Sequence, residues 1–486
     1  MVSKRNQSNC NLSYFDYNWG MNNVKEITSF LDNPSPKDLD LIQKAYAFSQ
    51  KAHEGHLRKS GGPYFDHLFA VAKNIAELGM GVSTIAAGFL HDCIEDRKTT
   101  AEDIKKEFGD EILFLVEGVT KLGKIKYGGT NRYNESLRKF FLAVSKDLRV
   151  LIIKLCDRLH NMQTLEFLPK EKQLSIAQET LEIYAPLAYR LGIKKLQREL
   201  EDLSFAYLYP EKSKEIKKIM KEKRGEVEKH LDKFQKSLKK ELAKNGITDF
   251  SMDHRVKSIY SLYKKMQKYK ENVENIYDIS ALRIIVSKLS DCYKILGIIH
   301  GSWRPLPGRI KDYIASPKLN GYKSIHTTIF TGDGGIIEVQ IRTEDMHKEA
   351  EHGIASHLSY KEEGVAGWIK ELIEYQKEAG DEFVEGIKHD FFEERIFVFT
   401  PIGDVIDLPK GSSTIDFAYA IHTDVGDHMS GAKVNGKMVA ITSTLVSGDR
   451  VEIETKKSAK PNQKWLPFCK TTMAKRRINN ALDSKK

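Results

Sequence analysis

Gly88-Phe-Leu-His-Asp-Cys-Ile-Glu-Asp96 is the stretch that decides how the first part of this chain folds. Its apolar residues end a predicted helix, so His91 and Asp92 lie at the edge of a core, where polar groups need a metal ion or a partner. Glu95 and Asp96 follow four residues later and share the faces of that pair if the helix continues. The stretch therefore predicts a helical domain built around a polar site.

Four residues of metal-ligating type belong to this predicted site: His67, His91, Asp92 and Asp157. Imidazole and carboxylate ligands together suit a divalent ion such as manganese or iron better than a metal that prefers thiolates. Acids beside such a site, here Glu95 and Asp96, can orient or deprotonate a water molecule. The alternative is that the histidines are ordinary polar groups of a core, because a lone His-Asp pair is common.

A basic turn lies before the first of these histidines. Arg58, Lys59 and Ser60 precede two glycines, and a cationic turn of this kind suits a phosphate or a nucleobase carbonyl. Alone the turn would decide nothing, but beside a metal site it adds candidate substrate contacts.

Composition points to a cytoplasmic protein of several domains. The chain has 486 residues, 41% of them apolar and 30% charged, as is ordinary for globular proteins. No stretch approaches the roughly 20 apolar residues of a membrane span, and the first residues lack the apolar core of a secretory signal. The net charge of +10 favours polyanionic partners, either nucleotides or RNA. The cysteines form no CxxC pair and predict buried reduced thiols: Cys10, Cys93, Cys156, Cys292 and Cys469.

Changes in sequence texture predict a multidomain α+β protein. Apolar residues at three- and four-residue spacing indicate helices, and short β-rich runs between turn signals indicate strands. The predicted units, in order, are an N-terminal tail (1–34), an all-α domain (35–210), a connecting helix (211–245), a mixed α/β domain (246–361), linker helices (362–394), a small β-rich domain (395–455) and a loosely ordered basic tail (456–486).

A second candidate site combines acids from two predicted strands. Asp278 precedes the strand predicted over Ala281–Val286, and Glu338 lies in the next β-rich run. Acids from two neighbouring strands can hold magnesium against nucleotide phosphates, and Glu338 can also accept a proton from a sugar hydroxyl. Strand alternation places Gln340 and Arg342 on the same face as Glu338.

Cations surround these acids in the sequence. A helix predicted to start near Arg255 carries charges at a spacing that can hold a triphosphate, on Arg255, Lys257, Lys264 and Lys265. The stretch from 307 to 326 interleaves prolines, glycines and aromatic residues with lysines, and it includes Tyr322. Such a loop suits a stacked purine and its phosphates, although Tyr322 alone would equally fit an aromatic residue packed on a core.

Several strings together resemble the RelA/SpoT family of alarmone enzymes, specifically its long bifunctional Rel-type members. The strings that carry the resemblance are Gly88–Asp96, Asp157-Arg-Leu-His-Asn161, Asp312-Tyr-Ile-Ala-Ser-Pro-Lys318, Gln340-Ile-Arg-Thr343 and, for a TGS domain, Ile415-Asp-Phe-Ala-Tyr-Ala-Ile-His-Thr423. The resemblance implies an all-α HD-type hydrolase domain, a mixed α/β nucleotidyltransferase-like synthetase domain and a small β-grasp TGS domain. Regions that usually follow the TGS domain in the family are not found in this sequence.

The resemblance implies a bifunctional enzyme of the stringent response. Its hydrolase domain would remove pyrophosphate from (p)ppGpp with Mn²⁺. Its synthetase domain would transfer pyrophosphate from ATP to the 3′-hydroxyl of GDP or GTP with Mg²⁺. In the hydrolase domain the metal ligands map onto His67, His91, Asp92 and Asp157, the catalytic acids onto Glu95 and Asp96, and nucleotide contacts onto Arg58, Lys59, Asn161 and Thr164.

In the synthetase domain, Asp278 and Glu338 match the magnesium-associated acids, and Tyr322 matches the tyrosine that stacks on the acceptor guanine. Phosphate contacts map onto Arg255, Lys257, Lys265, Lys311 and His326. In the TGS domain, His422 matches a residue that meets the 3′ end of tRNA, which implies tRNA and the ribosome as partners.

Two other functions stay open from the sequence. The chain could be a hydrolase alone with an inactive synthetase domain, or a regulatory module that binds the ribosome or tRNA. If both reactions occur, running them together would waste ATP. We therefore expect mutually exclusive conformations, coupled through the helices from Leu174 to Phe205 that lie between the two sites in sequence.

Overall fold

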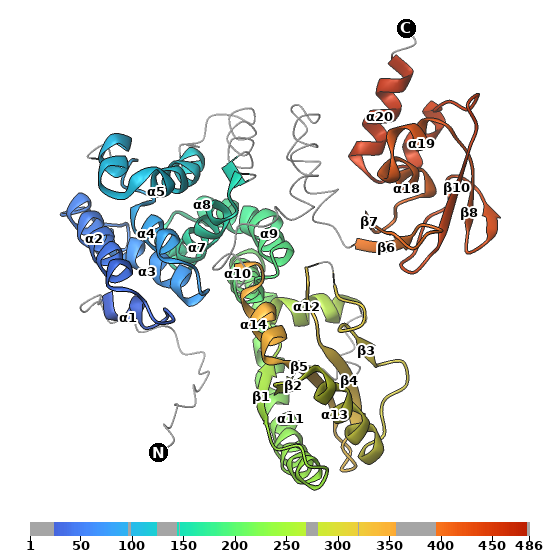
Figure 1. The fold of residues 1–486 in the computed structure, drawn as a ribbon, viewed down its shortest axis with the longest axis horizontal. Helices are drawn as coiled ribbons and strands as arrows, with labels where there is room; N and C mark the ends of the chain where they lie inside the picture. Colours follow the sequence, from blue (N-terminus) through green and yellow to red (C-terminus); the bar gives the residue numbers. More distant parts are fainter. Residues whose placement is uncertain are drawn as a thin grey trace.

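The computed structural model of the chain describes residues 24–95, 99–123, 143–144, 146–268, 280–318, 320–355 and 395–483. These residues form a helical domain, a mixed α/β domain that follows one long helix, and a small domain rich in strands (Figure 1). The predicted multidomain α+β fold class is confirmed. The predicted linker helices at 362–394 lie outside the described residues.

The helical domain consists of α1 (Val24–Thr28), α2 (Pro36–Ala52), α3 (Phe65–Glu77), α4 (Val82–Leu90), α5 (Ala101–Gly123), α7 (Arg149–Gln163), η1 (Leu165–Phe167), α8 (Lys170–Glu179), the π-helical turn η2 (Thr180–Tyr184), α9 (Ala185–Arg190) and α10 (Lys194–Leu208). A capping box between Ser35 and Asp38 starts α2. The tail predicted over residues 1–34 is wrong for its last part. Helix α1 lies within that range, and its Ile27 is fully buried in the core of this domain.

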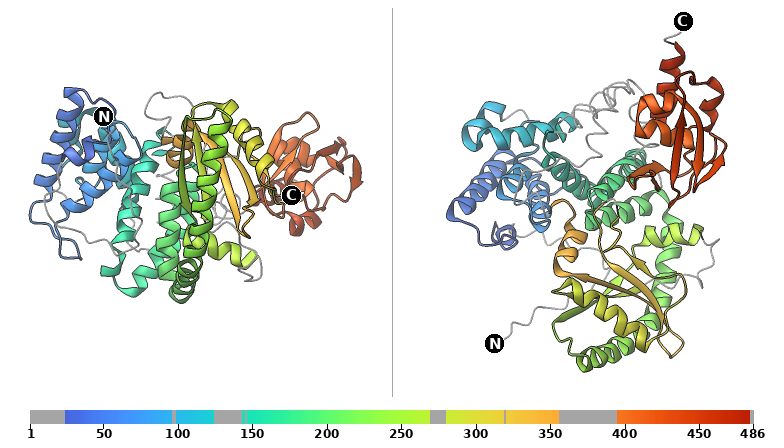
Figure 2. Two further views of the ribbon diagram at one scale, coloured as in Figure 1. Left: turned by 90° about the horizontal axis from the view of Figure 1, so that it is seen from below. Right: turned by 45° about the vertical axis from the view of Figure 1, so that its right-hand side comes forward.

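One long helix, α11 (Pro210–Lys244), follows the helical domain as predicted. Its buried apolar residues are Ile216, Leu231, Phe234, Leu238 and Leu242. The last four of them pack with α13 (Leu289–Ser302) against one face of a sheet (Figure 2). The charges of α11 therefore belong to its outer surface, as expected for an amphipathic helix.

The α/β domain is built on a five-stranded sheet in the order β1-β2-β5-β4-β3. Its strands are β1 (Phe250–Val256), β2 (Ser280–Val286), β3 (Lys311–Asp312), β4 (Ile325–Phe330) and β5 (Ile336–Thr343). Strands β2 and β5 are parallel neighbours, with Ala281 opposite Glu338, whereas the other pairs are antiparallel. The helices α12 (Ile259–Lys268) and α14 (Glu344–His352) complete the described part of this domain.

The helix predicted to start near Arg255 is wrong at its beginning. Arg255 lies in strand β1, and α12 begins only at Ile259. Strand β1 lies at the edge of the sheet, and its apolar and polar residues alternate only in its first half, where Phe250 and Met252 pack on the core. His254 and Arg255, in the second half, are both polar and do not continue this pattern.

The third domain combines β6 (Arg395–Phe399), β7 (Val405–Pro409), α18 (Thr414–Ile421), α19 (Thr423–Asp427), β8 (Met429–Val434), β9 (Lys437–Val439) and β10 (Val451–Thr455). A bridge between Phe399 and Arg450 links the β6-β7 pair to the sheet β10-β8-β9. Helix α18 packs on both sets of strands through buried residues such as Ile415 and Phe417. The predicted β-grasp arrangement agrees with this packing.

The predicted loosely ordered basic tail is also corrected by the structure. Residues 456–483 include a 3₁₀ helix, η5 (Gln463–Phe468), and α20 (Thr472–Asp483). Trp465, Ala474 and Ile478 of this segment are buried in the core of the third domain. Its many lysines and arginines concealed an apolar stripe at helical spacing.

Two expectations from composition concern the whole chain. Four of the five cysteines lie in the described residues as buried free thiols, as predicted: Cys93, Cys156, Cys292 and Cys469. None of the helices described is both long enough and apolar enough to cross a membrane.

Candidate active sites

The four predicted metal ligands, which we call the metal-ligand cluster, converge from three helices. His67 lies on α3 and Asp157 on α7, while His91 and Asp92 follow the end of α4. The Nε2 atom of His67 lies 3.3 Å from Oδ1 of Asp157 and 3.6 Å from Oδ2 of Asp92. The Nε2 atom of His91 lies 3.3 Å from the same Asp92 oxygen.

Hydrogen bonds turn one nitrogen of each imidazole toward the centre of the cluster. Nδ1 of His91 donates to the carbonyl oxygen of Gly88 at 2.8 Å, and Nδ1 of His67 pairs with Nδ1 of His160 at 2.8 Å. The Nε2 atoms therefore face the carboxylates, and Nε2 of His91 is buried without a hydrogen-bond partner. Ligand atoms of His67, His91 and Asp157 lie within 4.8 Å of one another. This donor set fits one divalent ion.

The electrostatics of the cluster also favour a cation. Burial opposes ionisation of Asp157, but Lys154 and the two imidazoles hold the pKa of this carboxyl well below its usual range. Burial likewise opposes protonation of His91, yet Asp92 and Asp157 raise the pKa of His91 to about 9. The carboxylates thus draw positive charge into the place that a divalent ion would fill.

Only some of the predicted nucleotide contacts are hydrogen-bonded to the metal-ligand cluster. Arg58 donates through Nη2 to Oδ1 of Asn161 at 2.7 Å, and Asn161 donates to a cluster carboxylate at 2.6 Å. Thr164 donates its hydroxyl to a backbone carbonyl, and Lys59 is exposed. The hydroxyl of Ser60 is buried without a hydrogen-bond partner. Arg58 and Asn161 therefore connect the basic turn directly to the cluster.

The expected helical continuation beyond His91 is wrong. Helix α4 ends at Leu90, and residues 91–95 form turns, so the four-residue spacing does not place Glu95 on the face of His91. Burial and then the charge of the Asp92 carboxylate raise the pKa of Glu95 to about 7. The second predicted acid, Asp96, lies outside the described residues.

Three further residues of this site are not predicted from the sequence. Tyr64 donates its hydroxyl to Oδ2 of Asp92 at 2.8 Å, and Lys154 pairs with Oδ2 of Asp157 at 2.7 Å. His160, kept neutral because burial and then His67 and Arg58 lower its pKa, lies against His67. A usable signal existed for Lys154 and His160, which lie three residues on either side of Asp157 on one helix.

A divalent ion should stabilise the folded chain through this cluster. At a concentration about 100 times its dissociation constant, an ion that binds only the folded state adds about 2.7 kcal/mol. We expect thermal unfolding after EDTA treatment to show a higher midpoint with Mn²⁺ than without it. Asp92→Ala should lose most of that shift, whereas Asp110→Ala, an exposed acid on α5, should keep it. Equal shifts in all three proteins would contradict a metal site here.

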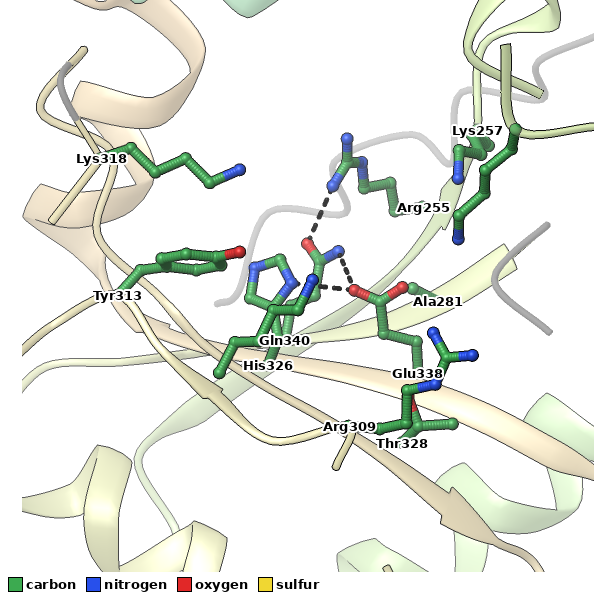
Figure 3. A pocket seen from close by; sticks show the side chains of 12 residues that line it. Arg255, Lys257, Ala281, Arg309, Tyr313, Lys318, His326, Thr328, Glu338 and Gln340 are labelled. Atoms are coloured by element: carbon green, nitrogen blue, oxygen red, sulfur yellow. Dashed lines mark hydrogen bonds and ion pairs between the residues drawn. The ribbon is translucent and has the colours of Figure 1, made fainter. Parts of the chain in front are cut away.

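The second site is a cavity of about 270 Å³ over the sheet of the α/β domain, which we call the cationic cavity (Figure 3). It is lined by Arg255, Lys257, Lys265, Ala281, Arg309, Lys311, Tyr313, Lys318, His326, Thr328, Glu338 and Gln340. Six of these side chains are cationic, and Glu338 is the one carboxylate among the described residues that line it. Such a concentration of positive charge suits a polyphosphate.

A hydrogen-bonded chain fixes Glu338 at the floor of this cavity (Figure 3). Nδ1 of His326 lies 2.9 Å from Oε1 of Glu338, and Gln340 donates to the same oxygen at 3.1 Å. Arg255 donates to the amide oxygen of Gln340 at 3.2 Å. Burial lowers the pKa of His326 despite the contact with Glu338. Glu338 is therefore held as an oriented carboxylate.

Some predicted residues of this site do not line the cavity, and one lies outside the residues that the structure describes. Arg342 is buried beyond the end of the cavity and pairs with Glu351 at 3.5 Å. Lys264 turns away to Glu201 at 2.9 Å. Tyr322 does not line the cavity, but its hydroxyl lies 2.8 Å from Nε2 of His326, which does. Asp278 lies outside the described residues, although β2 and β5 are neighbours as predicted.

The cavity is also lined by residues that are not individually predicted from the sequence: Arg309, Tyr313, Lys318 and Thr328. Lys318 lies with Nζ 4.6 Å from the ring centroid of Tyr313. Burial, followed by the charges of Lys311 and Arg255, lowers the pKa of Lys318. The first three lie in the Pro- and Lys-rich stretch that predicted the site, so the composition of that stretch was the available signal.

The last predicted residue, His422, lies in the third domain. It is exposed between α18 and α19, and its Nδ1 accepts a hydrogen bond from the backbone of Asp424 at 3.1 Å. The imidazole is therefore accessible from solvent on a fixed turn.

Three family models match this chain. Residues 45–194 match the HD domain, residues 254–365 match the region found in RelA / SpoT proteins, and residues 396–455 match the TGS domain. The three matched ranges follow the order of the helical, α/β and β-rich domains.

Curated relatives resemble the chain over most of its length. It is 46% identical over 456 residues to a guanosine-3′,5′-bis(diphosphate) 3′-pyrophosphohydrolase of Aquifex aeolicus, covering 92% of this chain and 65% of the relative. It is 45% identical over 469 residues to a GTP pyrophosphokinase of Streptomyces coelicolor, covering 90% and 55%. It is 42% identical over 464 residues to the bifunctional (p)ppGpp synthase/hydrolase SpoT of Escherichia coli, covering 93% and 66%. The chain thus spans between 55% and 66% of the length of these relatives.

Proposed function

Because this chain belongs to the RelA/SpoT family, we propose that it is a bifunctional enzyme of the stringent response. It hydrolyses (p)ppGpp to GDP or GTP and pyrophosphate at the metal-ligand cluster, and it makes (p)ppGpp from ATP and GDP or GTP at the cationic cavity. The observation that carries this proposal is the presence of two separate, differently charged sites in one chain.

For hydrolysis, His67, His91, Asp92 and Asp157 would hold the divalent ion, proposed to be Mn²⁺. Such an ion supplies a Lewis acid that activates water and neutralises pyrophosphate charge. Glu95, with a pKa raised to about 7, can exchange a proton with water or with the leaving oxygen, and Asp96 is proposed to share this role. The guanosine nucleotide is proposed to contact Arg58, Lys59, Ser60, Asn161 and Thr164.

For synthesis, the ATP triphosphate is proposed to lie among the cations of the cavity, including Arg255, Lys257, Lys265 and Lys311. The acceptor 3′-oxygen attacks the β-phosphorus of ATP, a bond forms between them, and AMP leaves with the bridging oxygen. Glu338 accepts the hydroxyl proton, held in place by His326 and Gln340. Asp278 and Glu338 would associate with Mg²⁺, which offsets phosphate charge. Tyr322 is proposed as the platform of the acceptor guanine.

The alternatives from the sequence are less well supported. A hydrolase with an inactive synthetase domain does not explain why Glu338 is oriented by two hydrogen bonds inside a cluster of cations. A purely regulatory module does not explain the metal-ligand cluster. We propose tRNA and the ribosome as partners of the TGS domain in addition to catalysis, on the basis of its match and of the exposed His422. Because ATP and GTP are cytoplasmic substrates, we also propose a cytoplasmic location.

Two separate assays test this function. With ATP, GDP or GTP and Mg²⁺, the protein should produce (p)ppGpp and AMP. With (p)ppGpp and Mn²⁺ it should release GDP or GTP and pyrophosphate. Failure of either reaction would remove that half of the proposal, and binding of tRNA without turnover in either assay would favour the regulatory module.

A further inference from the structure

One contact between the helical domain and the α/β domain covers the ring of Tyr322. The Nζ atom of Lys194, at the start of α10, lies 3.0 Å from the centroid of that ring. Lys318 lies 5.4 Å from the same centroid, and His326 holds the hydroxyl. Tyr322 is only 3% exposed. The ring is thus covered by side chains of both domains.

A purine cannot stack on the face that Lys194 covers. Carbon atoms in contact lie about 3.5–4.0 Å apart, so a stacked base would need the space that Nζ fills 3.0 Å above the ring. The amine must move before this face can accept a base. Movement of the side chain alone would be enough, because the lysine stem has several rotatable bonds.

The surroundings of Lys194 make its position electrostatically unfavourable. Burial and then the charges of Arg255, Lys318 and Arg342 lower the pKa of Lys194 well below its usual value. The Glu351 carboxylate opposes this shift, but it pairs with three arginines, and within the described ranges Lys194 forms no salt bridge with it. An amine held mainly by a ring contact is easier to displace than one paired with a carboxylate.

The turn before Lys194, at Leu191–Ile193, packs against the α/β domain. The backbone N–H of Ile354 donates to the carbonyl of Leu191 at 2.9 Å. A Cβ atom on Gly353 would lie 2.2 Å from that same carbonyl oxygen, so only glycine fits there. Asn320, two residues before Tyr322, donates to the carbonyl of Tyr189 at 3.3 Å. These contacts fix the start of α10 directly over the Tyr322 loop.

The same helix also contacts the domain that holds the metal-ligand cluster. Lys195, next to Lys194, pairs with Glu77 at the end of α3, the helix that carries His67. Further along α10, Asp202 accepts hydrogen bonds from the first backbone N–H groups of α12. Helix α10 therefore touches the supporting elements of both sites.

We propose that Lys194 is an autoinhibitory cover of the acceptor-base position at Tyr322. The proposal rests on the function proposed above, in which Tyr322 is the platform of the guanine. In the same conformation the ligands of the metal-ligand cluster lie together. One arrangement of the chain thus combines an assembled hydrolytic site with a closed acceptor position, and Lys194 must leave Tyr322 when synthesis begins.

A competing role for Lys194 predicts the opposite effect. An amine near Arg255 and Lys318 could instead bind a phosphate of the acceptor nucleotide. Removing a phosphate ligand would raise the KM for GDP, whereas removing a cover would lower it. The direction of the change therefore separates the two roles.

The test is the synthesis rate of Lys194→Ala in an Asp92→Ala background, where product is not degraded. We expect the KM for GDP to fall by roughly three- to tenfold, with little change in kcat at saturating GDP, because the ring contact that must be broken before a base can stack is absent. Lys194→Arg should behave like the Asp92→Ala parent, because it keeps a cation over the ring. Lys217→Ala, at an exposed lysine on α11, should also leave the KM unchanged.

An unchanged or raised KM in Lys194→Ala would contradict the proposal that Lys194 covers Tyr322. If the Asp92→Ala protein makes no product with or without Lys194, the proposed synthetase function itself fails. Synthesis that appears only when Lys194 is replaced would support both the synthetase function and the cover by Lys194. A second measurement does not depend on the variant folding: acylation of lysine amines, read by peptide mass, should label Lys194 faster with GDP present than without it. Equal labelling in both conditions would also overturn the cover.

Discussion

Glu338→Gln should abolish (p)ppGpp synthesis while leaving hydrolysis intact. Glutamine has the same shape and can keep contacts with His326 and Gln340, but it cannot accept the proton of the acceptor hydroxyl. General base catalysis contributes about a hundred- to ten-thousandfold, so we expect kcat for synthesis to fall by that range. The folded state should be little affected, because the side chain lines a cavity and forms no part of the core.

The measurement is AMP and (p)ppGpp production from ATP and GDP with Mg²⁺. Glu344→Gln is the matched control, because it makes the same chemical change six residues further along, at an exposed position at the start of α14. Synthesis by Glu338→Gln within about threefold of the parent would exclude Glu338 as the base.

Asp92→Ala should have the reverse effect and abolish hydrolysis without loss of synthesis. The Asp92 carboxylate lies within 3.3 Å of His91 and 3.6 Å of His67, so its removal takes a ligand from the metal-ligand cluster. Lewis acid catalysis contributes several kcal/mol, and each 1.36 kcal/mol is tenfold in rate, so we expect a loss of about a thousandfold or more. Release of pyrophosphate from (p)ppGpp with Mn²⁺ measures this loss.

Asp110→Ala should hydrolyse (p)ppGpp like the parent, because this acid is exposed and lies outside the cluster. Full restoration of Asp92→Ala at high Mn²⁺ would mean that Asp92 only strengthens metal binding. Undiminished hydrolysis at low Mn²⁺ would exclude it from the site.

The metal-ligand cluster was predictable from the sequence because its residues stand at the ends of apolar helices. Packing those helices into one core brings their polar ends together, as His67, His91 and Asp157 illustrate. The position of Glu95 relative to the helix was not predictable. Neither Cys93 nor Ile94 is a helix breaker, so the sequence does not predict that α4 ends at Leu90.

The second site was predicted in composition but not in detail. Strand β5 alternates buried isoleucine and valine with Glu338 and Gln340, so its cavity face could be identified. Strand β1 is an edge strand in which only Phe250–Asp253 alternates, and Arg255 lies beyond that part, so the sequence did not identify its strand. The contact of Lys194 with Tyr322 joins two domains, and no local pattern could predict it.

Mixing the two single-site variants tests most directly whether one chain carries two independent sites. With ATP, GDP and both metals, Asp92→Ala alone should convert GDP to ppGpp and then stop, and Glu338→Gln alone should form none. The mixture should release AMP and pyrophosphate continuously while GDP is regenerated. Continuous release of AMP and pyrophosphate by either variant alone would contradict two separate sites. So would a mixture in which release stops once the GDP has been converted a single time.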